Sequence, residues 1–284
     1  METTVSSATK ELVIGYDRPT VLIGERINPT GRKKLAEALK GGDLELVREE
    51  ARAQVQAKAD MLDVNVGTPG VDETSLLPET VQAVTEIVDV PLCIDSSNPR
   101  ALEAALKVYK GKALVNSVTG EDKSLKEILP VVKEYGAAVV GLTMDGEGVP
   151  GDAAKRVSIA RRIVEQAEAT GIPRQDVVID CLNLAVASDT GAALAVIAAI
   201  RQISGELGVN QTLGGSNVSF GMPDRNLINA AFLTLAVEAG VTCPIVDVAK
   251  MRPAILAVDM VLGRDSYGRR YIQAYRDRQR SSAR

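Results

Sequence analysis

The sequence predicts an α/β fold in which eight parallel strands close into a (β/α)8 TIM barrel. Eight short runs rich in β-branched residues alternate with segments of helical period along most of the 284 residues. Such an alternation requires parallel strands joined by helical crossovers, and the length suits one barrel of about 250 residues. A doubly wound open sheet is the alternative, but it expects a glycine-rich turn after the first strand. Here that strand continues as ERINPTGRKK, so we predict one barrel domain spanning 1–284.

The predicted strands are short and evenly spaced. Each combines aliphatic or β-branched residues, which favour extended backbone, with turn-forming or polar residues at its end. The eight strands are predicted at 21–27, 60–66, 91–96, 113–118, 137–143, 176–182, 211–218 and 243–249.

The predicted helices repeat apolar side chains at intervals of three and four residues. The segment 152–169 begins at Asp152, a typical N-cap residue, and ends before Gly171. Pro99 and Pro253 occupy positions where the first turn of a helix accepts proline. The helices are predicted at 43–58, 74–88, 99–109, 121–135, 152–169, 188–204, 225–239 and 253–262.

The two ends of the chain depart from this repeat. Residues 1–20 are polar, and we expect an irregular N-terminal arm that leads into the first strand. Residues 264–284 carry seven arginines and two aspartates, a net charge of +5 in a chain whose total is −4. We predict a solvated, basic C-terminal helix with a frayed end. The alternative is a docking element for an acidic protein.

The composition excludes several kinds of site. The chain has no histidine and only three scattered cysteines, which excludes histidine-dependent triads and histidine-ligated zinc and argues against a disulfide framework. Aromatic residues are 3% and the net charge is −4, which disfavours nucleic acid as a partner. No apolar run reaches the roughly 18 residues that cross a membrane. We therefore expect a cytoplasmic protein with no metal site and no membrane partner.

Acidic and amide side chains recur where the predicted strands end. The carboxyl ends of barrel strands meet at one mouth, where such barrels carry their active sites. Polar residues there also serve as helix N-caps and turn formers, but Asp95, Asn116 and Asp180 directly end β-branched runs. Carboxylates and amides together suit a polar heterocycle with alternating N–H and C=O groups. The sequence therefore predicts a ligand pocket at this mouth.

Seven motifs make the chain resemble the pterin-binding family of (β/α)8 barrels. Within that family it is similar to methyltetrahydrofolate:corrinoid methyltransferases and to the folate module of cobalamin-dependent methionine synthase. The resemblance implies a dihydropteroate-synthase-like barrel that moves a methyl group between N5 of tetrahydrofolate and a corrinoid cobalt by SN2 displacement. The motifs are IGERINPTGRKK, DVNVG, CIDSSN, VNSV, GLTMDGEGVP, VIDCL and GGSNVSFGMPDRNLIN.

The same resemblance implies roles for individual residues. It places Asp95, Asn116 and Asp180 at the edge of the pterin ring. It places Asn217 at N5, where a hydrogen bond stabilises the protonated nitrogen in the transition state. Some relatives read IDP where this chain reads IDC, and we interpret Cys181 as a small buried residue rather than a nucleophile. The predicted substrate-binding set is completed by Glu25, Asn28, Asp63, Asn65 and Arg225.

The resemblance also implies the substrates and partners. Tetrahydrofolate or methyltetrahydrofolate is one substrate, and the other is a corrinoid (cobalamin) carried by a separate protein, because this chain has no histidine to ligate the cobalt. A homodimer is implied as well. The direction of transfer stays open, with SNVSFGMPDR favouring transfer from methylcorrinoid to tetrahydrofolate.

Three alternative functions are weighed against methyl transfer. A dihydropteroate synthase needs Arg and Lys in the loop after the seventh strand, where this chain reads SNVS. A non-catalytic folate-binding protein would use the same residues and stays open. An aldolase-like barrel needs a Schiff-base lysine at a strand end, and we interpret Lys250 as a surface residue.

Overall fold

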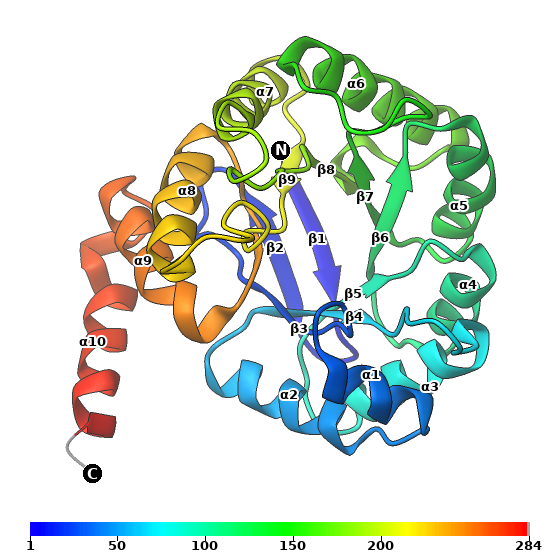
Figure 1. The fold of residues 1–284 in the computed structure, drawn as a ribbon, viewed down its shortest axis with the longest axis horizontal. Helices are drawn as coiled ribbons and strands as arrows, with labels where there is room; N and C mark the ends of the chain where they lie inside the picture. The colour runs from blue at the N-terminus through cyan, green and yellow to red at the C-terminus, as the bar shows by residue number, and fades with distance from the viewer. Residues whose placement is uncertain (283–284) are drawn as a thin grey trace.

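A computed structural model describes residues 1–282, and it contains an eight-stranded parallel barrel inside a ring of helices (Figure 1). Consecutive strands pair in order around the barrel, and the last strand pairs with the first. The ring closes where Ile245 N–H donates to the carbonyl of Leu213 at 2.9 Å. The predicted (β/α)8 fold is therefore confirmed. The barrel strands are β3 (Ile23–Ile27), β4 (Met61–Asn65), β5 (Leu92–Asp95), β6 (Leu114–Thr119), β7 (Ala138–Leu142), β8 (Val177–Asp180), β9 (Asn210–Thr212) and β10 (Ile245–Val246).

The helices follow the predicted order with one addition and one shift. Asp152 caps its helix by accepting the N–H of Lys155 at 2.8 Å, and Gly171 ends that helix in the left-handed region at φ 88°. Pro253 lies inside its helix and not in the first turn, which corrects the prediction, because the helix begins five residues earlier at Val248. The helices are α1 (Lys33–Lys40, not predicted), α2 (Glu45–Gln56), α3 (Glu73–Thr85), α4 (Pro99–Val108), α5 (Asp122–Glu134), α6 (Ala153–Thr170), α7 (Ala192–Glu206), α8 (Arg225–Ala239), α9 (Val248–Val261) and α10 (Arg269–Ser282), with 3-10 turns η1 (Arg174–Asp176) and η2 (Ser266–Gly268).

The N-terminal residues form a β-hairpin, so the predicted irregular arm is wrong. β1 (Glu2–Ser6) and β2 (Glu11–Gly15) pair antiparallel and cross the barrel axis in Figure 1. Val5 and Ile14 are fully buried and join the cluster of side chains inside the barrel that includes Met61 from the start of β4. The hairpin therefore closes the amino end of the barrel, opposite the carboxyl ends of the strands.

Hydrogen bonds fasten the hairpin to distant parts of the barrel. The Tyr109 hydroxyl donates to the carbonyl of Ser6 at 2.8 Å, and Asn210 Nδ2 donates to the carbonyl of Ile14 at 3.1 Å. The side chain of Thr3 donates to the carbonyl of Gln175. These bonds satisfy polar groups that would be costly to bury alone.

The C-terminal segment forms a helix, as predicted, that packs on α9 and extends away from the barrel (Figure 1). Asp265 caps α10 by accepting the N–H groups of Arg270 at 3.1 Å and Tyr271 at 3.0 Å. Arg270 also pairs with the buried carboxylate of Asp259 at 3.2 Å. The predicted frayed end falls on residues 283–284, outside the described residues. Across 1–282 the search for a helix able to cross a membrane finds none.

Candidate active site

A cavity of about 630 Å³ opens at the carboxyl ends of the barrel strands. Its lining comes from the ends of the barrel strands and from the loops that follow β3, β9 and β10. Of the nine site residues that the sequence predicts, the structure brings eight together there. These are Glu25, Asn28, Asp63, Asp95, Asn116, Asp180, Asn217 and Arg225.

The ninth predicted residue, Asn65, is not among the residues that line the cavity. Its Oδ1 accepts the N–H of Gly67 at 2.8 Å, and its side chain hydrogen-bonds the carboxylate of Asp95. Asn65 therefore supports a lining residue, which makes its predicted contact with the ligand indirect. The sequence could not separate the two roles, because Asn65 and Asp95 end adjacent strands at the same level.

Two carboxyl groups and one amide form the floor of the mouth. Asp63, Asp95 and Asn116 come from the adjacent strands β4, β5 and β6, and Asn116 Nδ2 donates to Asp63 Oδ1 at 3.2 Å. Burial raises the pKa of Asp63 well above its usual range, and the nearby carboxylate of Asp95 raises it further. Burial also raises the pKa of Asp95 to about 6. The carboxyl oxygens accept hydrogen bonds, and the Asn116 amide offers both a donor and an acceptor, which gives the floor both hydrogen-bonding senses.

Asp180 ends β8 and is 6% exposed. Its Oδ1 accepts the N–H of Leu182 at 2.6 Å. Burial raises the pKa of Asp180 to about 7, against the opposing effects of the Leu182 N–H and the positive charge of Arg156. Cys181 is fully buried, and burial raises the pKa of its thiol. This agrees with its interpretation as a small buried residue, since a reactive cysteine needs an accessible thiolate.

The loop between β9 and α8 carries Asn217 to the rim of the mouth. A Cβ at Gly214 would lie only 2.8 Å from Asn217 Nδ2, so the Asn217 side chain lies over the Gly214 backbone and a larger residue at 214 would displace it. Arg225 fixes this loop by donating to the carbonyl of Ser216 at 2.7 Å and to Ser219 Oγ at 3.0 Å. Its guanidinium also lies 5.9 Å from the ring centroid of Phe220. Arg225 is therefore a loop anchor as well as a lining residue.

Glu25 links the first barrel strand to this loop. Its Oε1 accepts the Ser216 hydroxyl at 2.7 Å. Burial raises the pKa of Glu25, and the carboxylate of Asp247 adds to the effect. The predicted site set includes Glu25 but not Ser216, although Ser216 directly precedes Asn217 in the sequence.

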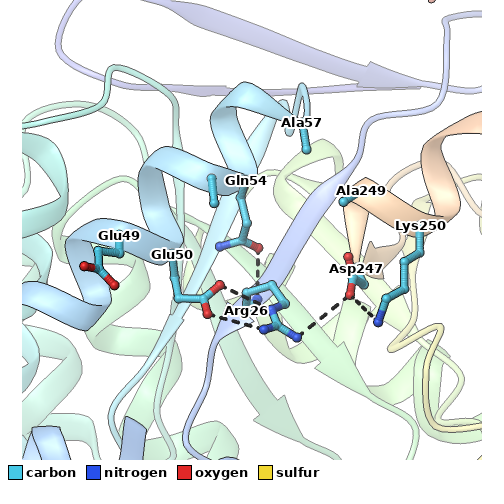
Figure 2. A pocket seen from close by; sticks show the side chains of 9 residues that line it. Arg26, Glu49, Glu50, Gln54, Ala57, Asp247, Ala249 and Lys250 are labelled. Carbon is cyan, nitrogen blue, oxygen red and sulfur yellow. Dashed lines mark hydrogen bonds and ion pairs between the residues drawn. The ribbon is translucent and has the colours of Figure 1, made fainter. Parts of the chain in front are cut away.

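A second hollow of about 490 Å³ lies beside the mouth, between α2 and the start of α9 (Figure 2). Its wall toward the mouth is a chain of ion pairs in which Arg26 Nε lies 3.2 Å from Glu50 and Arg26 Nη1 lies 3.9 Å from Asp247. Lys250 Nζ lies 3.0 Å from Asp247 with its side chain 52% exposed, in agreement with its interpretation as a surface residue. Gln54 Oε1 accepts the N–H of Arg26 at 2.9 Å. These pairs neutralise one another and hold the rim in place.

Several other lining residues stand outside the predicted site set. Most of them lie in loops or in the first turns of helices, where polar residues are ordinary. They include Arg26, Thr30, Arg32, Ser216, Phe220, Asn226, Asn229, Asp247, Lys250 and Met251. Within residues 1–282, no cluster of three or more acidic, cysteine or histidine side chains suits a metal ion.

Comparison with known proteins relates this geometry to a family. The chain is 34% identical over 266 residues to the methylcorrinoid:tetrahydrofolate methyltransferase of Eubacterium limosum, which covers 90% of this chain and 96% of that protein. It is 31% identical over 265 residues to the methionine synthase of Mycobacterium tuberculosis, covering 89% of this chain and 22% of that longer protein.

Solved structures support the fold. The dihydropteroate synthase of Yersinia pestis, bound to a pterine-sulfa conjugate, matches with a TM-score of 0.71 and 19% identity over 93% of this chain and 99% of that one. The enzyme of Xanthomonas albilineans in complex with 7,8-dihydropteroate matches with a TM-score of 0.67 and 21% identity, over 91% and 98%. A family model described as pterin binding enzyme matches residues 24–247, the segment that forms the barrel and all nine predicted site positions. The resemblance predicted from the seven motifs is thereby confirmed, and the chain belongs to the family of pterin-binding enzymes.

Proposed function

We propose that this chain transfers a methyl group from a methylated corrinoid, carried by a separate protein, to N5 of tetrahydrofolate. The observation that carries the proposal is the convergence of Asp95, Asn116, Asp180 and Asn217 on one mouth. The similarity to a relative named for this reaction supports both the chemistry and its direction.

The floor of the mouth suits the edge of a pterin. A carboxylate accepts two parallel N–H bonds from a 2-amino-pyrimidinone, as it does from a guanidinium. Asp95 on the floor and Asp180 at the end of β8 accept such bonds when ionised, and Asn116 offers both a donor and an acceptor. The site thus matches a ring with alternating N–H and C=O groups.

The transfer itself places little demand on acid–base groups of the chain. N5 forms a bond to the methyl carbon as the methyl–cobalt bond breaks, the bonding pair stays with the cobalt, and the proton of N5 leaves. Positive charge develops on N5, and the side-chain oxygen of Asn217 is the group that we assign to stabilise it. In the reverse direction the same contact holds the protonated amine that must leave. A rim open to solvent, with Asn217 exposed on it, allows the second substrate to approach.

The experiment mixes the purified protein, without oxygen, with methylcobalamin and tetrahydrofolate, and in parallel with cob(I)alamin and methyltetrahydrofolate. The cobalt spectrum reports transfer in either direction. We expect conversion in both mixtures, with methyl transfer to tetrahydrofolate the faster. Tight folate binding without conversion, even with a cognate corrinoid protein, would show that the chain binds folate without catalysing methyl transfer. Absence of folate binding would refute the pterin assignment.

Folate affinity is expected to decrease as the pH is lowered from about 7 to about 6. Burial raises the pKa values of Asp180 to about 7 and Asp95 to about 6, so both lose their charge as the pH falls through that range. The neutral forms accept fewer N–H bonds, and the dissociation constant should rise up to about tenfold per pH unit below pH 7. Calorimetric titration from pH 5.5 to 8.5 measures this. A constant affinity across the window would show that the carboxylates do not bind the ligand.

A homodimer remains a proposal, and the outer faces of α7 and α8 support it. Leu194, Leu227 and Leu235 are 72%, 67% and 50% exposed on these helices, which lie side by side in Figure 1. We expect Leu235→Glu to convert a dimer into a monomer in sedimentation experiments, whereas Val261→Glu, on the equally apolar end of α9, should not. A wild-type monomer would contradict the proposal.

A further inference from the structure

One buried cation, the only buried arginine or lysine among the residues whose burial the structure describes, lies on α6 behind the wall of the mouth. Arg156, in the first turns of that helix, is 1% exposed and is not among the residues that line the cavity. Burial lowers the pKa of its guanidinium, because the charged form loses its hydration. A buried charge costs several kcal/mol unless its partners compensate for the lost water. The contacts of Arg156 should therefore show why the fold retains it.

Those contacts are made to the backbone of one loop. Arg156 Nη1 donates to the carbonyl oxygen of Leu182 at 2.7 Å and also to that of Cys181. Its Nε has no hydrogen-bond partner among residues 1–282. The acceptors are thus carbonyl groups and not carboxylates, so Arg156 acts on the shape of the loop that follows β8.

Leu182 is hydrogen-bonded both to Arg156 and to Asp180. Leu182 accepts a hydrogen bond from Arg156 through its carbonyl, and its N–H donates to Asp180 Oδ1 at 2.6 Å. Its backbone has a φ of +50°, in the left-handed region that costs a residue with a side chain about 1–2 kcal/mol. Hydrogen bonds on both sides of Leu182 supply the compensation that this conformation needs.

We propose that Arg156 is a positioning residue for ligand recognition, which holds the loop after β8 so that Leu182 N–H fixes the Asp180 carboxylate in the mouth. The proposal rests on the proposed function for the identity of the ligand. It adds a residue that touches neither substrate. Sequence reasoning could not find it, since an arginine near the start of an amphipathic helix is ordinarily solvated.

The surroundings of Asp180 make the charge of Arg156 matter as well as its shape. The titratable groups that face Asp180 are Arg156 on α6, Cys181 beside it in the chain, and Cys243 before β10. Asp152, the N-cap of α6, faces Arg156 in turn. Arg156 is the one cation in this set. Its removal should therefore make Asp180 harder to ionise.

The test compares Arg156→Met and Arg156→Lys with the wild type. Arg161→Met is the matched control, because Arg161 lies on the same helix with its side chain 46% exposed in a surface ion pair. For Arg156→Met we expect about a tenfold rise in the dissociation constant for tetrahydrofolate and a turnover number at saturation within about threefold of wild type. The pH midpoint of binding should move up by about one unit. Arg156→Lys keeps the charge, so its midpoint should stay near that of wild type while its affinity falls a few-fold.

A folded Arg156→Met variant with wild-type affinity and midpoint would overturn the proposal. If that variant does not fold, Arg156→Lys decides, and an affinity equal to that of wild type would overturn it. The pH dependence of thermal unfolding reports the ionisation of Asp180 without any ligand, so the charge effect can be measured even if the protein does not bind folate. Failure of the proposed function is seen separately, as wild-type protein that binds no tetrahydrofolate.

Discussion

Replacing Asn217 with alanine is expected to slow single-turnover methyl transfer by about 10²–10³-fold, by analogy with the loss of one hydrogen-bonding group that stabilises charge in a transition state. The side chain lies across Gly214 at the rim of the mouth, and its amide has no hydrogen-bond partner among the side chains of the described residues, which leaves it available to a ligand. The floor groups that bind the pterin edge are untouched. Folate affinity should therefore change by less than about tenfold while the rate falls.

Rapid mixing of the folate-loaded enzyme with its methylated corrinoid substrate measures this rate. Asn226→Ala is the matched control, because it removes an amide from the same rim without disturbing Asn217. A single-turnover rate of Asn217→Ala within about threefold of the wild-type rate would show that Asn217 has no role in the transfer step. An equal loss in both variants would point to damage to the rim as a whole.

Replacing Asp180 with asparagine is expected to weaken folate binding by about 100-fold and, at pH 8, to make the protein more stable. The binding loss follows because an amide offers one acceptor and no charge where a carboxylate accepts two N–H bonds. The stability gain follows from the pKa of Asp180, which burial raises to about 7. A carboxyl whose pKa is raised in the folded state favours folding when it is protonated, and that contribution is lost as the pH rises from about 4 to about 7. Keeping Asp180 ionised at pH 8 costs roughly 4 kcal/mol.

Thermal unfolding of both proteins at pH 8 and pH 5 separates these effects. At pH 8 the melting temperature of Asp180→Asn should exceed that of wild type by several degrees. At pH 5 the carboxyl is protonated in the folded state but still ionised in the unfolded state, so the difference should shrink to less than half of its value at pH 8 and close only near pH 4. Asp176→Asn, a buried acid near the closed end of the barrel that pairs with Lys112 at 2.6 Å, should instead destabilise the fold. A variant less stable than wild type at both pH values would contradict the assigned cost of Asp180.

The sequence allowed the barrel and most of its mouth to be predicted, because both depend on local pattern. Parallel strands place their carboxyl ends at one level, so Asp63, Asp95 and Asp180 could be placed together without knowing the loops. The seven motifs then indicated the pterin-binding family, and the resemblance to that family implied the ligand. Most element boundaries differ from the prediction by a few residues. The strand predicted at 211–218 is wrong at its end, because β9 stops at Thr212 and Asn217 lies in the loop that follows. The helix predicted at 253–262 begins earlier, which puts Pro253 inside α9.

What could not be predicted depends on contacts between distant parts of the chain. In the sequence, Val5 and Ile14 are isolated apolar residues in a polar terminus. Only the structure shows that both are buried inside the barrel. The partners of Arg156 lie 25 and 26 residues away, in a loop with no regular pattern. Asn65 and Asp95 are neighbours across two strands, and only their hydrogen bond distinguishes the supporting residue from the lining one.

The hairpin of β1 and β2 has a consequence for the order of events in turnover. Because it fills the amino end of the barrel, a pterin bound as we propose has a single way in and out, the same opening that the proposed corrinoid protein would cover. Under that proposal folate has to bind first, and its methylated product has to wait for the partner to dissociate. Kinetics of a compulsory-order ternary complex follow, with inhibition at high concentrations of the corrinoid protein. Free cobalamin, which covers far less of the opening, should inhibit much less.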